Sequence, residues 1–205
     1  ATVTFTPSTV AGDTFTVTAQ SGGASGNSGL ITVAASTVLS YVTVTAPSSV
    51  TAGTTYSMTL KAYDASGNFM STYGGTHTYS FAGPALAPDG TAAMYDDATP
   101  VAAMETSYTF VNGNAVINFA LYKAETTTIT ITDTAVPTAS ATTGSITVLP
   151  ATVDHYIVTA PGGPYSTDET FYVTITPVDV YDNVAAGSNA VTVGRTEISG
   201  GAVAG

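Results

Sequence analysis

The chain has 205 residues, a net charge of −11 and a charged fraction of only 8%, where an ordinary soluble domain has about 25%. Its basic residues are Lys61, Lys123 and Arg195, too few for the clustered cations that bind nucleic acid or an anionic membrane surface. The absence of cysteine excludes disulfides, thiolate metal sites and cysteine nucleophiles, and no apolar run is long enough to cross a bilayer.

Val, Ile, Tyr and Phe recur along the whole chain with Thr between them, and this mixture favours strands over helices. Helices need charged side chains for their exposed face, and here Thr, Ser, Asn and Gly supply the polar surface instead. We therefore expect an all-β protein.

Residues 1–36 are predicted to form only the last strands of a repeat. Two stretches recur roughly 115 positions later in the chain. Gly29-Leu-Ile-Thr-Val33 recurs as Gly144-Ser-Ile-Thr-Val148. The stretch that follows it, Tyr41-Val-Thr-Val-Thr-Ala-Pro47, recurs as Tyr156-Ile-Val-Thr-Ala-Pro161. The earlier matches are Phe5 with Phe119, Phe15 with Ile129 and Val17 with Ile131. Because all these matches fall in one order at nearly one spacing, chance is a poor explanation for them, and we interpret them as an internal repeat.

Residues 37–150 are predicted to form one complete repeat. Apolar–polar alternation between turn signals places strands at residues 41–45, 56–63, 76–81, 106–111, 115–121, 127–132 and 145–148. Asp64 to Asn68 reads as a turn, a long loop runs from Pro84 to Pro100, and Asn112-Gly113 is a strong hairpin signal. This pattern, without helices, describes an immunoglobulin-like β-sandwich that lacks the Cys and Trp core.

Residues 151–205 are predicted to form only the first strands of a further repeat. The segment Leu60–Asn68 aligns with Ile175–Asn183, so Asp179 matches Asp64. Leu149-Pro-Ala-Thr152 imitates part of a sortase signal, but no Gly follows, and we interpret it as a linker between repeats. The expected fold class is all-β, with tandem immunoglobulin-like sandwiches, one complete and two partial.

These motifs resemble a known group of repeats. The pattern Leu60-Lys-Ala-Tyr-Asp-Ala-Ser-Gly-Asn68, followed by Thr78-Tyr-Ser-Phe81 and by Asn112-Gly-Asn-Ala-Val-Ile-Asn-Phe119, is similar to the bacterial Ig-like repeats of invasin and intimin type. The resemblance covers residues 41–133 well, and residues 1–19 and 156–183 in part. It implies a spacer role in adhesins, cell-wall proteins or surface fibres of prokaryotes, a group in which catalysis is rare.

The candidate catalytic residues do not form a recognisable set, so we expect no enzyme. His77 and His155 occupy unrelated positions in different repeats, and neither lies near a nucleophile elbow or an oxyanion turn. An isopeptide cross-link would need a buried lysine, whereas Lys61 alternates onto the threonine-rich face and Lys123 sits at a strand end beside Glu125.

One group of polar residues has the composition of a calcium site. Asp64, Asn68, Asp96 and Asp97 would approach one another if the long loop folded over the first turn, and hard cations take oxygen ligands of this kind. The loop also holds Asp89, and the next repeat recreates the acidic turn with Asp179, Asp182 and Asn183. The competing interpretation is that Asp and Asn in turns bond to the local backbone. No other cofactor is expected.

The partial repeats suggest how the protein assembles. A half-sandwich leaves unpaired edge strands and an exposed apolar face, and residues 1–36 of one chain supply the strands that residues 151–205 of another lack. Strand addition of this kind would join chains head to tail, and a head-to-tail contact that does not close gives a filament. Two alternatives stay open, since the same boundaries fit a segment cropped from a longer tandem array or one unit of a partly known filament.

We therefore expect an extracellular or cell-surface structural subunit, a homopolymer whose partners are copies of itself. The alternative from another class is an adhesin-type binding module that recognises a glycan or a surface receptor through its acidic and Tyr-rich loops. The tyrosines considered for such a face are Tyr63, Tyr73, Tyr79, Tyr95, Tyr108 and Tyr122, although tyrosine is equally common as core filler. O-glycosylation of the many Thr and Ser residues stays open.

Overall fold

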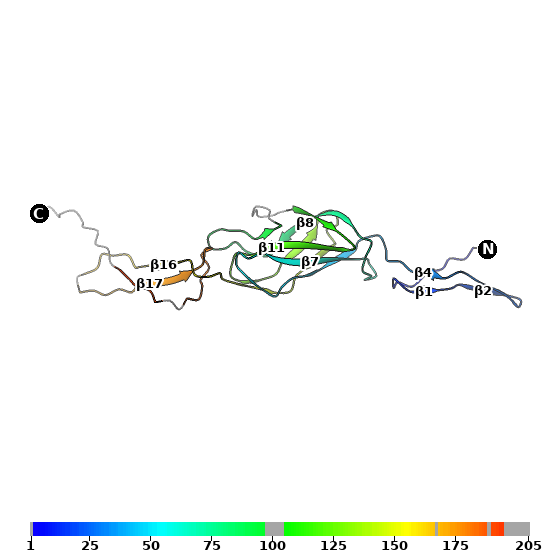
Figure 1. Cartoon of the computed structure of the whole chain (residues 1–205), viewed down its shortest axis with the longest axis horizontal. Helices are drawn as coiled ribbons and strands as arrows, with labels where there is room; N and C mark the ends of the chain where they lie inside the picture. Colours follow the sequence, from blue (N-terminus) through cyan, green and yellow to red (C-terminus); the bar gives the residue numbers. More distant parts are fainter. Residues whose placement is uncertain (1, 97–104, 167, 188–189, 195–205) are drawn as a thin grey trace.

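The computed structural model describes residues 2–96, 105–166, 168–187 and 190–194, and these ranges contain strands and turns without any helix. The all-β prediction is confirmed. Figure 1 shows three parts in line, namely the N-terminal segment (residues 2–36), the middle module (residues 37–150) and the C-terminal segment (residues 151–194). Across the described ranges, no helix has the length and apolarity needed to traverse a membrane.

The middle module is built from two four-stranded sheets and a smaller one. The first sheet has the order β5 (Tyr41–Thr45), β7 (Tyr56–Tyr63), β11 (Asn114–Ala120) and β9 (Met94–Tyr95). The second has the order β10 (Glu105–Phe110), β8 (Gly75–Ala82), β13 (Thr130–Asp133) and β14 (Ser140–Thr142). The third has the order β12 (Thr126–Thr127), β15 (Ile146–Leu149) and β6 (Ser49–Thr51), with β15 and β6 parallel.

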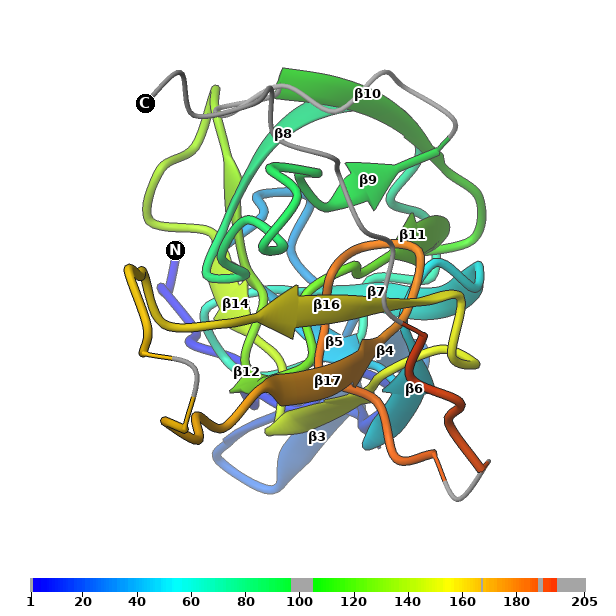
Figure 2. The ribbon, with the colours of Figure 1, turned by 90° about the vertical axis from the view of Figure 1, so that its left-hand side faces the viewer.

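The core lies between these sheets, which enclose it when the molecule is viewed along its long axis (Figure 2). Alternate residues of each strand point inward, as the period of two requires. His77 on β8 is half-buried, and Tyr79 and Phe81 on the same face are buried. The largest fully buried side chains of the module are Tyr79, Phe110, Phe119, Met58, Leu60, Met70, Ile117, Leu121, Ile129, Ile131 and Ile146.

The outward face of the β10-β8-β13-β14 sheet is lined by hydroxyl groups. Cross-strand hydroxyl pairs form between Thr76 and Thr109 at 3.2 Å, Thr78 and Ser107 at 3.0 Å, Thr130 and Thr142 at 3.0 Å, and Thr132 and Ser140 at 3.3 Å. Such pairs stabilise a sheet without charge. The low charged fraction of the sequence therefore has a direct structural counterpart.

The strands differ from the predicted ones where the chain passes between sheets. The predicted strand 127–132 is split into β12 and β13, which belong to different sheets. The Asn112-Gly113 turn forms, but only the Val111–Asn114 bridge joins its two arms, because β10 and β11 diverge into opposite sheets. Three short strands, β6, β9 and β14, were not predicted.

The N-terminal segment repeats the end of the middle module. Its β1 (Thr14–Phe15) pairs with β4 (Ile31–Thr32) as β12 pairs with β15, and β2 (Thr18–Ser21) pairs with β3 (Ala24–Asn27) as β13 pairs with β14. The main chain of Val17 bonds to Ser28 as that of Ile129 bonds to Thr143. Val17 thus corresponds to Ile129, two residues away from the match made on sequence.

The C-terminal segment repeats the start of the middle module. Its β16 (His155–Thr159) pairs with β17 (Thr174–Val178), and the Val178–Val184 bridge corresponds to Tyr63–Phe69. The register of this pair differs from that of β5 and β7 by one residue. Tyr41 lies opposite Tyr63, whereas its counterpart Tyr156 lies opposite Pro177 and not opposite Val178, the counterpart of Tyr63. A shift of one residue turns alternate side chains to the other face.

Candidate functional site: the joints between successive segments

The turn after β7 connects the middle module to the segment before it. The carboxylate of Asp64 accepts an N–H from Ser66 and another from Asn68 within the turn, at 2.9 Å each. It also accepts the backbone N–H of Ser36, 28 residues earlier, at 2.9 Å. Asp64 is buried, and this one side chain therefore fixes both its own turn and the linker that enters the module.

Asn68 extends the same turn to the N-terminal segment. Its side-chain N–H donates to the carbonyl of Thr9 at 2.8 Å, and its side-chain carbonyl accepts the N–H of Ala11 at 2.9 Å. Its amide nitrogen also donates to Asp64 at 3.0 Å. Both amide hydrogens and the oxygen of Asn68 are thus satisfied. We call this set of contacts, centred on Asp64 and Asn68, the first latch.

The turn after β17 repeats the arrangement at the next joint. Asp179 accepts the N–H of Ala151 at 2.8 Å, and Asn183 donates to the carbonyl of Tyr122 at 2.7 Å and accepts the N–H of Ala124 at 2.7 Å. Asp179 also accepts the N–H of Tyr181, and that of Asn183, within its turn. This second latch, centred on Asp179 and Asn183, reproduces each contact of the first, with both side chains buried.

Both latches favour the ionised carboxylate. The side-chain amide of Asn68 and the N–H groups of Ser36 and Asn68 lower the pKa of Asp64 from 3.8 to about 2. For Asp179, burial alone would raise the pKa, but the donors from Asn183, Ala151 and Tyr181 together lower it. Each carboxylate is a fixed negative charge, and the partners that stabilise it among the described residues are N–H dipoles.

The second joint has additional contacts that the first lacks. The phenol ring of Tyr181, where the first turn has Ser66, packs edge-on against Tyr122 with ring centroids 4.9 Å apart. The ring also lies over Gly53, where a Cβ would overlap the phenol. Since Gly53 has a φ of 74° and no side chain, it leaves the space that Tyr181 fills.

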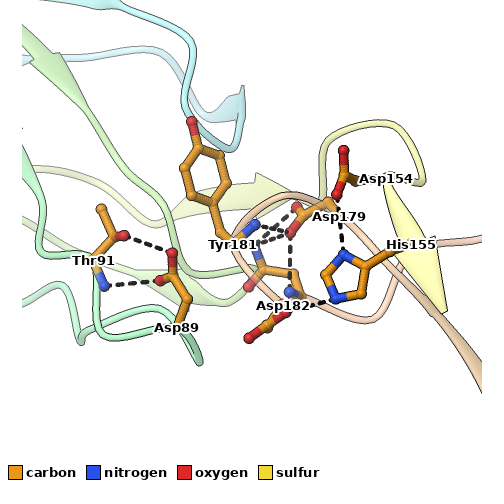
Figure 3. Close-up of polar contacts among 8 residues, drawn as sticks. Asp89, Thr91, Asp154, His155, Asp179, Tyr181 and Asp182 are labelled. Atoms are coloured by element: carbon orange, nitrogen blue, oxygen red, sulfur yellow. Dashed lines mark hydrogen bonds and ion pairs between the residues drawn. The ribbon is translucent and has the colours of Figure 1, made fainter. Parts of the chain in front are cut away.

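His155 forms a second set of polar contacts beside this latch (Figure 3). Its Nδ1 lies 3.0 Å from Asp154 and its Nε2 lies 3.2 Å from Asp182, a residue of the latch turn. Asp182 has a φ of 62°, where the first turn has Gly67 with a φ of 81°. The three side chains are partly exposed, so these contacts are worth little to stability.

The long loop of the middle module also lies at the second joint. The N–H of Asp89 donates to the carbonyl of Tyr181 at 3.3 Å, and the Asp89 carboxylate holds its own loop through Thr91 (Figure 3). Glu125 accepts the N–H of Ala85 at 2.9 Å and pairs with Lys123 at 3.2 Å, the partner predicted for that lysine. The described part of the loop thus faces the next segment.

The structure does not bring the predicted calcium ligands together. Asp64 and Asn68 are neighbours, but Asp96 bonds to Asn118 near the other end of β7, roughly 20 Å away by strand geometry. Asp97 lies outside the described residues. Among the residues that are described, no three His, Asp or Glu side chains gather as metal ligands would. Asp64 and Asn68 serve the latch, and the calcium site stays a prediction.

The other candidate residues occupy local structural positions. His77 stacks on Tyr73, bonds to its hydroxyl at 3.0 Å and lies 3.8 Å from the buried Asp133. Lys61 is exposed on β7. The latch partners could not be found from the sequence because Thr9, Ala11, Tyr122 and Ala124 take part through main-chain atoms. The available signal was the recurrence of Asp and Asn at the same positions in both repeats.

Comparisons with known proteins give only distant similarities. No protein-family model matches the chain, and no curated protein matches it. Among solved structures, the surface layer protein SbsC, domains 4–9, has 17% identity and a TM-score of 0.36, covering 85% of this chain and 25% of that one. Domains 5–6 of the S-layer protein SbsC have 16% identity and a TM-score of 0.34, covering 73% of this chain and 66% of that one.

A glycosyl hydrolase family 2 member from Bacteroides cellulosilyticus DSM 14838 has 17% identity and a TM-score of 0.36, covering 57% of this chain and 16% of that one. The chain therefore spans a quarter of the SbsC domain 4–9 structure and a smaller part of the hydrolase. These likenesses are too weak to assign a function, and the joints are the feature from which a function is inferred.

Proposed function

We propose that this chain is a non-enzymatic structural subunit of an extracellular or cell-surface filament or stalk. It assembles head to tail with copies of itself, by strand complementation between residues 151–205 of one chain and residues 1–36 of the next. The observation that carries the proposal is the repeated latch. The same Asp and Asn contacts hold each segment to the one before it, as a protein that extends along one axis requires.

The shape and surface of the molecule support this role. The segments follow one another in line (Figure 1), and the outward face of the β10-β8-β13-β14 sheet carries cross-strand pairs of uncharged hydroxyl groups. Large apolar side chains are exposed in both end segments, including Phe5, Leu30, Phe171 and Tyr172. Exposed edges and apolar faces of this kind call for a partner.

The adhesin alternative requires a loop that is presented to a ligand. The described part of the 84–100 loop instead contacts Tyr181 of the following segment. Of the tyrosines considered for a sugar-binding face, Tyr79, Tyr95 and Tyr108 are buried in the core. No contact among the described residues favours recognition of a glycan or receptor, and the structural role is the better supported one.

Electron microscopy of the assembled protein tests the proposal. We expect fibres with a uniform axial repeat, since each joint uses the same set of hydrogen bonds. Monodisperse single particles at concentrations where the protein is soluble would contradict a filament role.

A further inference from the structure

In the described part of the C-terminal segment, no strand takes the place that β11 has in the middle module. In the middle module, β7 runs between β5 and β11, but β5 pairs only with residues 59–63 of β7. Residues Tyr56–Met58 pair with β11 alone. Their counterparts 115 positions later, Phe171–Val173, lie just before β17 and are not in a strand. The residues that pair with β11 alone in β7 are thus the ones whose counterparts are not part of β17.

The same residues expose an apolar face that the middle module buries. Met58 is 1% exposed, whereas its counterpart Val173 is 39% exposed and Phe171, two residues before it, is 48% exposed. Within the described ranges, no strand pairs with β17 on the edge opposite β16. An extended segment with apolar residues at every second position would fit both the edge and the face.

The N-terminal segment carries a stretch of this kind. Residues 2–6 correspond to β11 through the match of Phe5 with Phe119, which also pairs Val3 with Ile117. Ile117 and Phe119 are 0% and 1% exposed, whereas Val3 and Phe5 are 85% and 58% exposed. Thr2, Thr4 and Thr6 alternate with them, so the stretch has the pattern of a strand but pairs with no strand in the described residues.

We propose that residues 2–6 of a second copy add as an antiparallel strand to residues 170–174, with Val3 opposite Val173 and Phe5 opposite Phe171. This register copies the middle module, where Ile117 lies opposite Met58 and Phe119 opposite Tyr56. The proposal rests on the self-assembly proposed above and names the surfaces involved. Main-chain bonds along the edge supply the pairing, and the two apolar pairs fix its register.

The latches fit this arrangement. Thr9 and Ala11, the main-chain partners of Asn68 in the first latch, come four and six residues after Phe5, whereas Tyr122 and Ala124 come three and five residues after Phe119, so the N-terminal stretch has one more residue before its latch. A donated strand would therefore complete the preceding copy while its own chain continues directly into a latch. Every joint along the fibre would then have the same construction, whether it lies within one chain or follows a contact between two.

The chain has no cysteine, so introduced thiols report the register cleanly. Directly opposed residues are close enough for a disulfide, and we expect Val3→Cys with Val173→Cys to give a ladder of cross-linked chains after mild oxidation. The matched control is Val3→Cys with Tyr172→Cys, because Tyr172 alternates to the opposite face. Cross-linking in the first variant but not in the control supports the proposal.

The remaining outcomes overturn it in distinguishable ways. A disulfide within single chains would show that the strand comes from the same molecule. Fibres without cross-links in either variant would reject this register and leave the filament role intact, whereas absence of fibres from the unmodified protein would reject the filament role itself. As a second measurement, Phe5→Asp should reduce assembly at least about tenfold, since a charge would be buried, while Thr4→Asp, on the outward face, should not.

Discussion

At the scale of single residues, Asp64 is the most heavily used polar group of the first joint. Its two oxygens accept N–H groups from Ser36, Ser66 and Asn68, the last through both its main chain and its side chain. An acceptor that is surrounded by donors remains ionised, and protonation would place a hydrogen where a donor already points. The joint is therefore coupled to the charge of one carboxylate.

This coupling predicts loosening of the first joint in acid. The folded pKa of Asp64, about 2, lies below its ordinary value of 3.8, so the ionised latch contributes fully above 3.8 and is lost as the pH falls towards 2. The amide resonance of Ser36, followed by NMR during an acid titration, should shift across this range. Asp64→Asn should abolish the transition, whereas Asp168→Asn, in the segment between β16 and β17, should leave it unchanged; a transition that persists in Asp64→Asn would contradict the assignment.

The sequence predicted only part of the role of these residues. Asp64, Asn68, Asp179 and Asn183 stand out by type and spacing, and local bonding to the backbone was one of the two interpretations. Their distant partners could not be predicted, because Thr9 and Tyr122 contribute carbonyl oxygens that every residue possesses. Calcium was the other interpretation, since the same oxygens suit a hard cation, and the sequence does not place Asp96 relative to Asp64.

At the scale of elements, the local sequence at Asn112-Gly113 predicts the turn itself but not how the two strands beside it pair. Asn112 and Gly113 have φ values of 50° and 75°, as an Asn-Gly turn prefers. The strands beyond it still separate into two sheets, because their apolar faces oppose each other across the core. Long strands such as β7 and β11 were predicted to within a residue or two, whereas two- and three-residue strands have too few alternations to detect.

Gly113 gives a prediction at this scale. Its Cα lies against the carbonyl of Met70 and the ring of Phe69, so a Cβ would overlap both. Gly113→Ala should therefore destabilise the middle module by more than the roughly 1 kcal/mol that a positive φ costs alone. Gly90→Ala is the matched control, since Gly90 has a φ of 93° and nothing within 4 Å of its Cβ position. Urea unfolding measures the difference, and equal losses would contradict a steric cause.

At the scale of the whole molecule, the internal repeat determines the order of the parts and the latches determine how they are joined. The sequence also predicted one complete and two partial repeats, and that division stays a prediction. The contacts at the joints could not be predicted from the sequence, since they arise from hydrogen bonds to main-chain groups far away in the chain. In each latch the Asn side chain makes two direct bonds to the preceding segment, worth about 1 kcal/mol apiece.

Removing the Asn contacts of both latches should make the molecule flexible. The variant with Asn68→Ala and Asn183→Ala keeps its core but loses these bonds, and we expect small-angle X-ray scattering to show a broader distribution of shapes with a shorter mean extension. Asn114→Ala with Asn118→Ala is the control, because the side chains of both residues bond within the middle module, to Asn112 and Ser57. Identical scattering from the two double variants would show that other contacts hold the segments in line.

Outside its own turn, each latch bonds to main-chain groups, so the side chains at its partner positions are free to change over generations. The latched positions are Thr9, Ala11 and Ser36 at one joint and Tyr122, Ala124 and Ala151 at the other, and the same bonds form in both. A duplicated segment needs to retain only its Asp and Asn to be inherited with a working connection. The remaining surface is left to drift, so a long array is able to diversify while its joints stay interchangeable.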